Sequence, residues 1–294
     1  MAQPLRVITF TTDAATVIAL QRGSFAAEGL KVELTVTPDS TTQMRGLSAG
    51  TWDIASTAFD NVLAWSGREG AEIVTMAQPK DEIILPMIVR PEIRDWNDLR
   101  GRRLAADAVD TAYALVLRSI LLAHGLDLKR GDYELVAKGA WRQRLESMIR
   151  GETFAAIINV PGDVQAVAAG MVRFADQREV LPSYQGTVWA VTRAWGQSHR
   201  DELVNFLRIW LKSVRWTNDP ANREEAIRLI AEGLGVNPSG ATTLLEEVSA
   251  NGALNLAGIK SVLGLRVQFD LTPPMGPDIE RYYDLSYYQA ALGR

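Results

Sequence analysis

The feature that most constrains the fold is an alternation of short strand-like segments with amphipathic segments along residues 5–77. The strand-like segments are LRVITF (5–10), KVELTV (31–36), WDIAST (52–57) and EIVTMA (72–77). Helices are predicted from Ala14, from Ser40 or Thr41, and after the AFDN turn, and Gly23 and Gly50 stand where a helix usually ends. This alternation predicts a mostly parallel sheet with helices on its faces.

The same pattern restarts once, which predicts a second α/β lobe. Its segments are RRLAAD (102–107), a helix over 111–124, YELVA (133–137), a helix over 141–150, FAAIIN (154–159), GDVQAVAAGM (162–171) and VRFAD (172–176). Pro86 interrupts the apolar run 83–90, and a central strand seldom accepts proline, so this run is interpreted as a crossing between lobes. The segment 179–192, with Pro182 and Gly186, is interpreted as the return crossing.

These boundaries predict lobe one as residues 1–85 and 185–294 and lobe two as residues 86–184, with hinges near 85–90 and 181–187. From Ser198 the chain is almost wholly helical, beginning with Ser198 and Asp201 at capping-box spacing. We expect this helical part to pack back onto lobe one.

Composition excludes several classes of protein. The chain has 294 residues, 47% hydrophobic and 22% charged, and its net charge of −4 comes from interspersed residues without a basic stripe, so nucleic-acid binding is not expected. It has no cysteine, which removes disulfides, thiolate metal sites and cysteine nucleophiles. No apolar run is long enough to span a membrane, and MAQPLRVITF leads almost directly into a strand, so we expect either a cytosolic chain or one whose signal peptide has been removed.

Catalytic motifs are missing from the sequence. There is no HExxH, GxSxG, Walker or GxGxxG motif, and neither His124 nor His199 pairs with a recognisable nucleophile. We therefore expect no catalytic residue, no metal and no cofactor.

Three segments carry a resemblance to a known family: RGSFAAEGLKVEL (22–34), QMRGLSAGTWDIAST (43–57) and DWNDLRGRRLAAD (95–107). In this order, and with the late helices VNFLRIWLKSVRWTNDPANREEAIRLIAE (204–232), the chain resembles type II periplasmic substrate-binding proteins of ABC importers. The resemblance is to the NMT1/THI5-like group, which includes alkanesulfonate-, taurine-, nitrate- and thiamine-pyrimidine-binding proteins. Trp52 departs from this pattern, because the family usually has a small polar or charged residue there, and the family's multi-arginine anion sites are not evident.

The resemblance implies a two-lobed α/β fold that closes on a small-molecule ligand and is then recognised by a membrane permease. It also implies a periplasmic or otherwise extracytoplasmic protein, which we expect to be a monomer. An enzyme on the same fold, a decarboxylase of aromatic acids or a pyrimidine-precursor synthase, is the main alternative. The effector domain of a LysR-type regulator ranks last, because the chain has no N-terminal helix-turn-helix.

In such a fold the ligand meets strand ends and helix starts. The predicted ligand-binding residues at these positions are Thr11, Thr12, Asp13, Thr16, Ser40, Thr41, Ala58, Phe59, Asp60, Asn61, Asp110, Thr111, Tyr113, Trp141, Arg142, Asn159, Pro161 and Gln185.

Some of these residues have a second interpretation that the sequence leaves open. Asp13, Asp60 and Asp110 are also of the type that caps helices, and we expect Asp60 to cap its helix while Asn61 and the neighbouring backbone face the ligand. Trp141 and Tyr113 are either flat pocket walls or core residues. Arg142, at a helix start, is the predicted basic anchor, which favours an organic acid or sulfonate with an apolar or aromatic body.

Overall fold

The computed structural model describes residues 3–81, 83–159 and 162–293. Its contacts divide the chain into two compact units. Unit 1 consists of Met1–Glu82, Gln185–Lys260 and Thr272–Arg294, and unit 2 of Ile83–Tyr184 and Ser261–Leu271. Each unit contains one five-stranded sheet.

The sheet of unit 1 has the strand order β2-β1-β3-β10-β4. Its strands are β1 (Leu5–Thr9), β2 (Val32–Val36), β3 (Ile54–Ala58), β4 (Ile73–Ala77) and β10 (Thr187–Thr192). β1 pairs in parallel with β2 and β3, whereas β10 runs antiparallel to both β3 and β4. The sheet is thus completed by β10, which follows the first segment of unit 2, Ile83–Tyr184, in the sequence.

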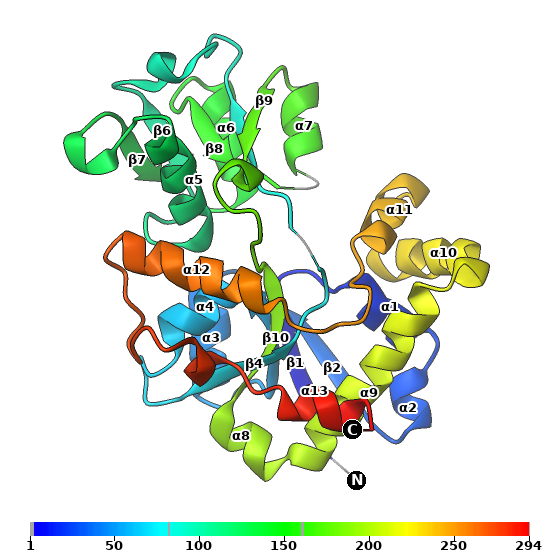
Figure 1. The fold of residues 1–294 in the computed structure, drawn as a ribbon. Helices are drawn as coiled ribbons and strands as arrows, with labels where there is room; N and C mark the ends of the chain where they lie inside the picture. The colour runs from blue at the N-terminus through cyan, green and yellow to red at the C-terminus, as the bar shows by residue number, and fades with distance from the viewer. Residues whose placement is uncertain (1–2, 82, 160–161, 294) are drawn as a thin grey trace. The chain divides into compact units, whose positions relative to one another are not determined.

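Helices cover this sheet (Figure 1). The early ones are α1 (Ala14–Gln21), α2 (Ser24–Ala27), α3 (Ser40–Ser48) and α4 (Phe59–Trp65). The later ones are α8 (Arg193–Ser198), α9 (Arg200–Thr217), η4 (Pro220–Asn222), α10 (Arg223–Leu234), α11 (Pro238–Glu246), η5 (Ile279–Tyr282) and α13 (Ser286–Ala291). Residues Leu256–Gln268 form α12, which the division of units splits after Lys260.

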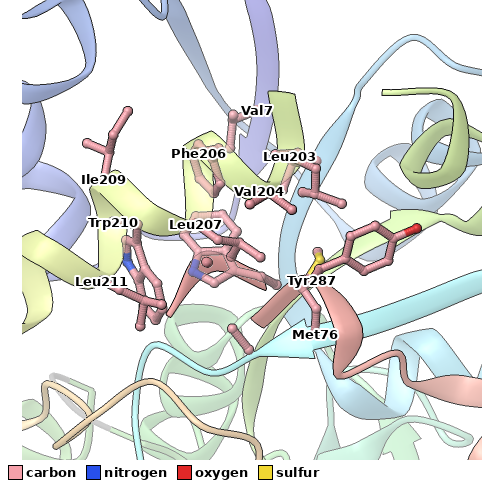
Figure 2. Packing of buried hydrophobic residues seen from close by; sticks show 14 of the residues in the cluster. Val7, Met76, Leu203, Val204, Phe206, Leu207, Ile209, Trp210, Leu211 and Tyr287 are labelled. Atoms are coloured by element: carbon pink, nitrogen blue, oxygen red, sulfur yellow. The ribbon is translucent and has the colours of Figure 1, made fainter. Parts of the chain in front are cut away.

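The core of unit 1 is built around the amphipathic helix α9. Figure 2 shows its side chains, among them Phe206, Leu207 and Trp210, packed with Met76 of β4 and Tyr287 of α13. Trp189 of β10 makes edge-on ring contacts with Phe206 at 5.3 Å and with Trp210 at 6.0 Å between centroids. The late helical segment therefore supplies much of the apolar surface that holds the first sheet.

The sheet of unit 2 has the order β7-β6-β8-β5-β9. Its strands are β5 (Pro86–Val89), β6 (Arg103–Ala106), β7 (Glu134–Ala137), β8 (Ala155–Ile157) and β9 (Val172–Asp176). Its helices are η1 (Trp96–Leu99), α5 (Ala112–Ala123), η2 (Leu128–Arg130), α6 (Trp141–Ile149), α7 (Gly162–Ala168) and η3 (Gln177–Glu179). β6 pairs in parallel with β7 and β8, while β5 runs antiparallel to β8 and β9.

Three local expectations differ from the structure. Residues 86–89 form β5 inside the sheet of unit 2, and Pro86 is accepted because it is the first residue of the strand. Ser198 does not begin a helix: it ends α8, and its hydroxyl donates to the carbonyl of Ala194. Residues 261–271 belong to unit 2, where Phe269 lies under the guanidinium of Arg118 and Asp270 pairs with Lys129.

Candidate functional site

The carboxyl ends of the parallel strands form a rim on each unit. We define the unit 1 rim as residues 10–13, 37–43, 57–61 and 185–187, and the unit 2 rim as residues 107–113, 138–144, 158, 159 and 162. In unit 1, Thr9 of β1 is opposite both Val36 of β2 and Ser56 of β3, so β1 and β2 end together and β3 continues for two more residues. In unit 2, Ala106 of β6 is opposite Ala137 of β7, and Ala105 is opposite Ala156 of β8.

Hydrogen bonds hold the unit 1 rim together. The Thr37 amide donates to the Thr9 carbonyl at 2.9 Å, and the Thr9 hydroxyl donates to the carbonyl of Thr11 at 2.7 Å. The Phe59 amide donates to the Gly186 carbonyl at 2.9 Å, which joins the start of α4 to the segment before β10. Thr11 is exposed and Thr12 half-buried on this rim.

The segment STAFDNVLAW (56–65) runs from β3 into α4. The N-cap is Ala58, which has no side-chain acceptor, so the expectation that Asp60 caps the helix is wrong. Asp60 is instead buried within the first turn, next to the fully buried Phe59. An acidic side chain in this turn still interacts favourably with the helix dipole. Asn61 is half-buried and donates from Nδ2 to the Thr57 hydroxyl at 3.0 Å.

Two aspartates cap the other helices of the unit 1 rim. Asp13 caps α1: its Oδ1 accepts from the Thr16 amide at 3.1 Å and from Trp210 Nε1 at 3.2 Å, and its Oδ2 accepts from the Thr16 hydroxyl at 2.5 Å. Burial raises the pKa of the Asp13 carboxyl above its usual range, against these hydrogen bonds, which lower it. Asp39 caps α3 at an exposed position, and Ser40 and Thr41 are the first two residues of that helix.

Two glutamines are buried at the same rim. Gln185 is 1% exposed, donates from Nε2 to the Thr187 carbonyl at 3.0 Å and accepts from the Asn255 amide at 3.4 Å. The sequence interpretation missed Gln43, which is fully buried on α3 and donates to the Ser56 carbonyl at 3.0 Å. Its Oε1 has no hydrogen-bond partner within the described part of the chain. Gln43 follows three polar residues, Ser40 to Thr42, in α3, so the local sequence gives no sign that it is buried.

On the unit 2 rim, the loop after β6 is closed by a short polar contact. The Thr111 hydroxyl donates to Asp107 Oδ1 at 2.5 Å and approaches the Ala108 carbonyl at 3.0 Å. Thr111 is the N-cap residue of α5, but its side chain makes no capping hydrogen bond because it is engaged with Asp107. Asp110 is exposed in this loop, so it is not the cap, and Tyr113 is half-buried in the first turn of α5.

Trp141 begins α6 and lies against the start of α7. A Cβ placed on Gly162 would come within 2.5 Å of the Trp141 ring, so the glycine permits this close approach. Arg142 is exposed, and its guanidinium lies over the Trp141 ring at 4.4 Å from the centroid. Arg142 therefore lies on the solvent side of the Trp141 ring.

The arginine buried at this rim is Arg144, which the sequence interpretation missed. It is 3% exposed, and its Nε and Nη1 atoms have no hydrogen-bond partner among the residues that the structure describes. Nη1 lies 3.9 Å from Asp107 Oδ1, and the guanidinium lies 5.7 Å from the centroid of the Tyr113 ring. Burial lowers the pKa of Arg144, against the opposing effect of Asp107. Helical spacing was the available signal, since residues 141, 144, 145 and 148 share one face.

Asn159 follows the end of β8. Asn159 is half-buried, and its carbonyl accepts from the Gly162 amide at 2.8 Å. Pro161 lies outside the described residues. Within the described ranges, no group of histidine or acidic side chains is arranged to hold a metal ion. No helix among the same residues is long and apolar enough to cross a membrane.

Two five-stranded sheets with this strand order and these helices define the type II periplasmic-binding-protein fold. Residues 11–223 match the NMT1/THI5-like family, and the chain belongs to that family. No curated protein sequence matches the chain.

Three of the solved structures similar to this fold are described as ligand-binding proteins or components. The periplasmic aliphatic sulphonate-binding protein SsuA from Escherichia coli superposes with a TM-score of 0.76 at 18% identity, over 97% of this chain and 93% of that chain. The zinc-bound ligand-binding component of an ABC-type import system from Staphylococcus aureus gives 0.77 at 16% identity, over 99% of both chains. The periplasmic nitrate-binding protein NrtA from Synechocystis PCC 6803 gives 0.78 at 12% identity, over 99% of this chain and 88% of that chain. At these identities the likeness shows the fold.

Proposed function

We propose that the chain is a solute-binding protein that captures a small organic molecule and delivers it to an ABC importer. The observation that carries this proposal is membership of the NMT1/THI5-like family over residues 11–223 together with the import components that share its fold. A membrane permease is then its partner, and an extracytoplasmic location and a monomeric state follow as parts of the same proposal.

The two rims support binding by directed polar groups. They present backbone amides of first helical turns together with short polar side chains, which is how ligand pockets fix the orientation of small molecules. Neither histidine belongs to a rim: His124 stacks on Trp96 and pairs with Glu179, and His199 contacts the Trp195 carbonyl. The rim residues thus supply recognition groups and no nucleophile activated by a histidine base.

The experiment that tests this function is titration calorimetry against a panel of small carboxylates, sulfonates, pyrimidines and neutral aromatic compounds. The bound compound is then released and identified by mass spectrometry. A solute-binding protein returns the compound unchanged after prolonged incubation. Slow conversion into a product, abolished by substitution of a rim residue, contradicts the proposal and supports an enzyme on the same fold.

A further inference from the structure

Arg144 is an unusual residue for the interior of unit 2. A buried guanidinium normally forms hydrogen bonds with a carboxylate or carbonyl, because an unpaired buried charge is costly. At 3% exposure, with two nitrogen atoms unsatisfied among the described residues, Arg144 lacks this compensation. These donors are available for an additional acceptor.

Asp107 does not serve as that acceptor. Its Oδ1 already accepts from the Thr111 hydroxyl at 2.5 Å, while the distance from the same oxygen to Arg144 Nη1 is 3.9 Å, beyond hydrogen-bonding range. The carboxylate therefore attracts the guanidinium through space without satisfying its N–H groups.

The helix starts around Arg144 add to its positive potential. The N-cap of α6 is Ala140, which has no side-chain acceptor, and the Thr111 cap of α5 makes no side-chain capping bond. The first-turn amides of both helices are thus left without a side-chain cap, and each helix start carries about half a positive charge. Of the two other cations on this rim, Lys138 is already paired with Glu152 at 2.7 Å, and Arg142 is exposed with its guanidinium over the Trp141 ring.

We propose that Arg144, on the unit 2 rim, binds the anionic group of the solute, and that the ligand is a small organic monoanion whose flat body lies against Trp141. This inference rests on the proposed solute-binding function and names the ligand class for that function. Arg is suited to a carboxylate or sulfonate because its planar donors contact two oxygens at once.

The groups around Arg144 indicate that the ligand carries a single negative charge. Arg144 and Asp107 together have a formal charge of zero, and a monoanion raises the negative charge of the cluster to one. A dianion such as a phosphate monoester would add a second charge beside Asp107, and like charges at this range repel. Gly162 and the Arg142 guanidinium both lie against the Trp141 ring, so the flat body of the ligand takes the place of the Arg142 guanidinium over that ring.

The test measures binding of benzoate and benzenesulfonate by calorimetry to the wild type and to Arg144→Gln, Arg144→Lys and Arg142→Gln. Benzamide serves as the neutral analogue, and phenylphosphonate as the dianion. Arg150→Gln is a matched control, because Arg150 follows the same helix and is paired with Glu146 and Glu152. Thermal unfolding of each variant confirms that it is folded.

We expect at least one of the two monoanions to bind the wild type, and Arg144→Gln to weaken its binding by at least about 30-fold, as for loss of a buried charge partner. Arg144→Lys should retain part of the affinity because a lysine keeps the charge without the two-point contact. Arg150→Gln should change the affinity by no more than about 3-fold, as expected for a surface position, and Arg142→Gln should weaken binding less than Arg144→Gln does.

Three outcomes would overturn the inference. These are failure of both monoanions to bind the wild type, benzamide or phenylphosphonate binding as tightly as benzoate, and an anion affinity that depends on Arg142 but not on Arg144. If a neutral compound from the wider panel binds and is returned unchanged, the solute-binding function stands while the ligand class proposed here fails. Conversion of a bound compound counts instead against the solute-binding function.

Discussion

Two of the three rim helices of unit 1, α1 and α3, begin differently from α5 and α6 of unit 2, whereas α4 of unit 1 also lacks a side-chain cap. In unit 1 the side chains of Asp13 and Asp39 cap α1 and α3 and place carboxylates at the helix starts. In unit 2, α5 and α6 have no side-chain caps, and a buried arginine lies behind them. Both rims arise from the same strand–helix arrangement, so the difference shows that the capping residue sets the local charge without any change of topology.

The largest effect that tests this comparison is expected at Asp13. Asp13→Ala removes the cap of α1 and leaves the buried Trp210 Nε1 without an acceptor. We expect the free energy of unfolding to fall by about 2–4 kcal/mol, as the sum of a lost cap and an unsatisfied buried donor. Chemical denaturation measures the loss.

Asp39→Ala is the matched variant, because Asp39 makes the same type of cap at an exposed position. It should cost about 1 kcal/mol. Equal losses for the two variants would show that the buried partner of Asp13 contributes nothing, and the role assigned to Trp210 would have to be withdrawn.

The next largest effect concerns the contact between Trp141 and α7 in unit 2. Gly162→Ala places a Cβ within 2.5 Å of the Trp141 ring and 2.8 Å of Ile158, so we expect a loss of about 1–3 kcal/mol from overpacking. Gly264→Ala is the control: a Cβ there meets nothing within 4 Å, and the position is inside helix α12. That variant should gain up to about 1 kcal/mol, and a gain at Gly162 as well would refute the close approach.

A smaller effect is expected from giving unit 2 the caps of unit 1. Ala140 has the extended backbone of an N-cap, so Ala140→Asp and Ala140→Ser should each stabilise the protein by about 0.5–2 kcal/mol. Only the aspartate adds a negative charge beside Arg144, so only Ala140→Asp should also weaken benzoate binding. If both variants or neither weakened binding, charge at the helix start would not be the cause.

The smallest expected effect is a dependence of stability on pH through Asp13. Burial raises the pKa of this carboxyl in the folded protein, so folding favours its protonated form. That contribution to stability is fully present below the ordinary Asp pKa of about 3.9 and is lost as the pH rises through the folded pKa.

As the pH rises from about 4 toward neutrality, the free energy of unfolding of the wild type should therefore fall relative to that of Asp13→Asn. Carboxyls with a lowered pKa, such as Glu152 at about 2 beside Lys138 and Arg150, are present in both proteins and cancel. A difference independent of pH would contradict the raised pKa.

The strands and helices followed closely from local pattern, because each strand is short and apolar and each helix is periodic. The predicted segment 72–77 contains β4, the predicted segment 154–159 contains β8, and the helix predicted over 141–150 is α6 with one residue fewer. Pro86 was the harder case, because local sequence shows the missing donor but not which position of the strand it occupies.

The site residues were harder to predict from the sequence, because their position depends on which face of a helix is buried. Arg142 and Arg144 are only two residues apart in the sequence, yet Arg142 is exposed over the Trp141 ring and Arg144 is buried. Asp13 and Asp60 are both acidic residues at helix starts, but only Asp13 is a cap, since α4 begins two residues earlier than expected, with Ala58 as its N-cap. Capping depends on the backbone dihedrals of a single residue, which composition does not set.

The place of β10 between β3 and β4 has a consequence for biosynthesis. A ribosome releases β1 to β4 first, but β10 lies between β3 and β4 in the sheet, so the edges of β3 and β4 that pair with β10 stay unpaired until residues 187–192 have been made. All five strands of unit 2 lie within residues 86–176 and can pair as soon as they emerge. The second sheet can therefore be completed before the first, which leaves the facing edges of β3 and β4 unpaired for longer during synthesis.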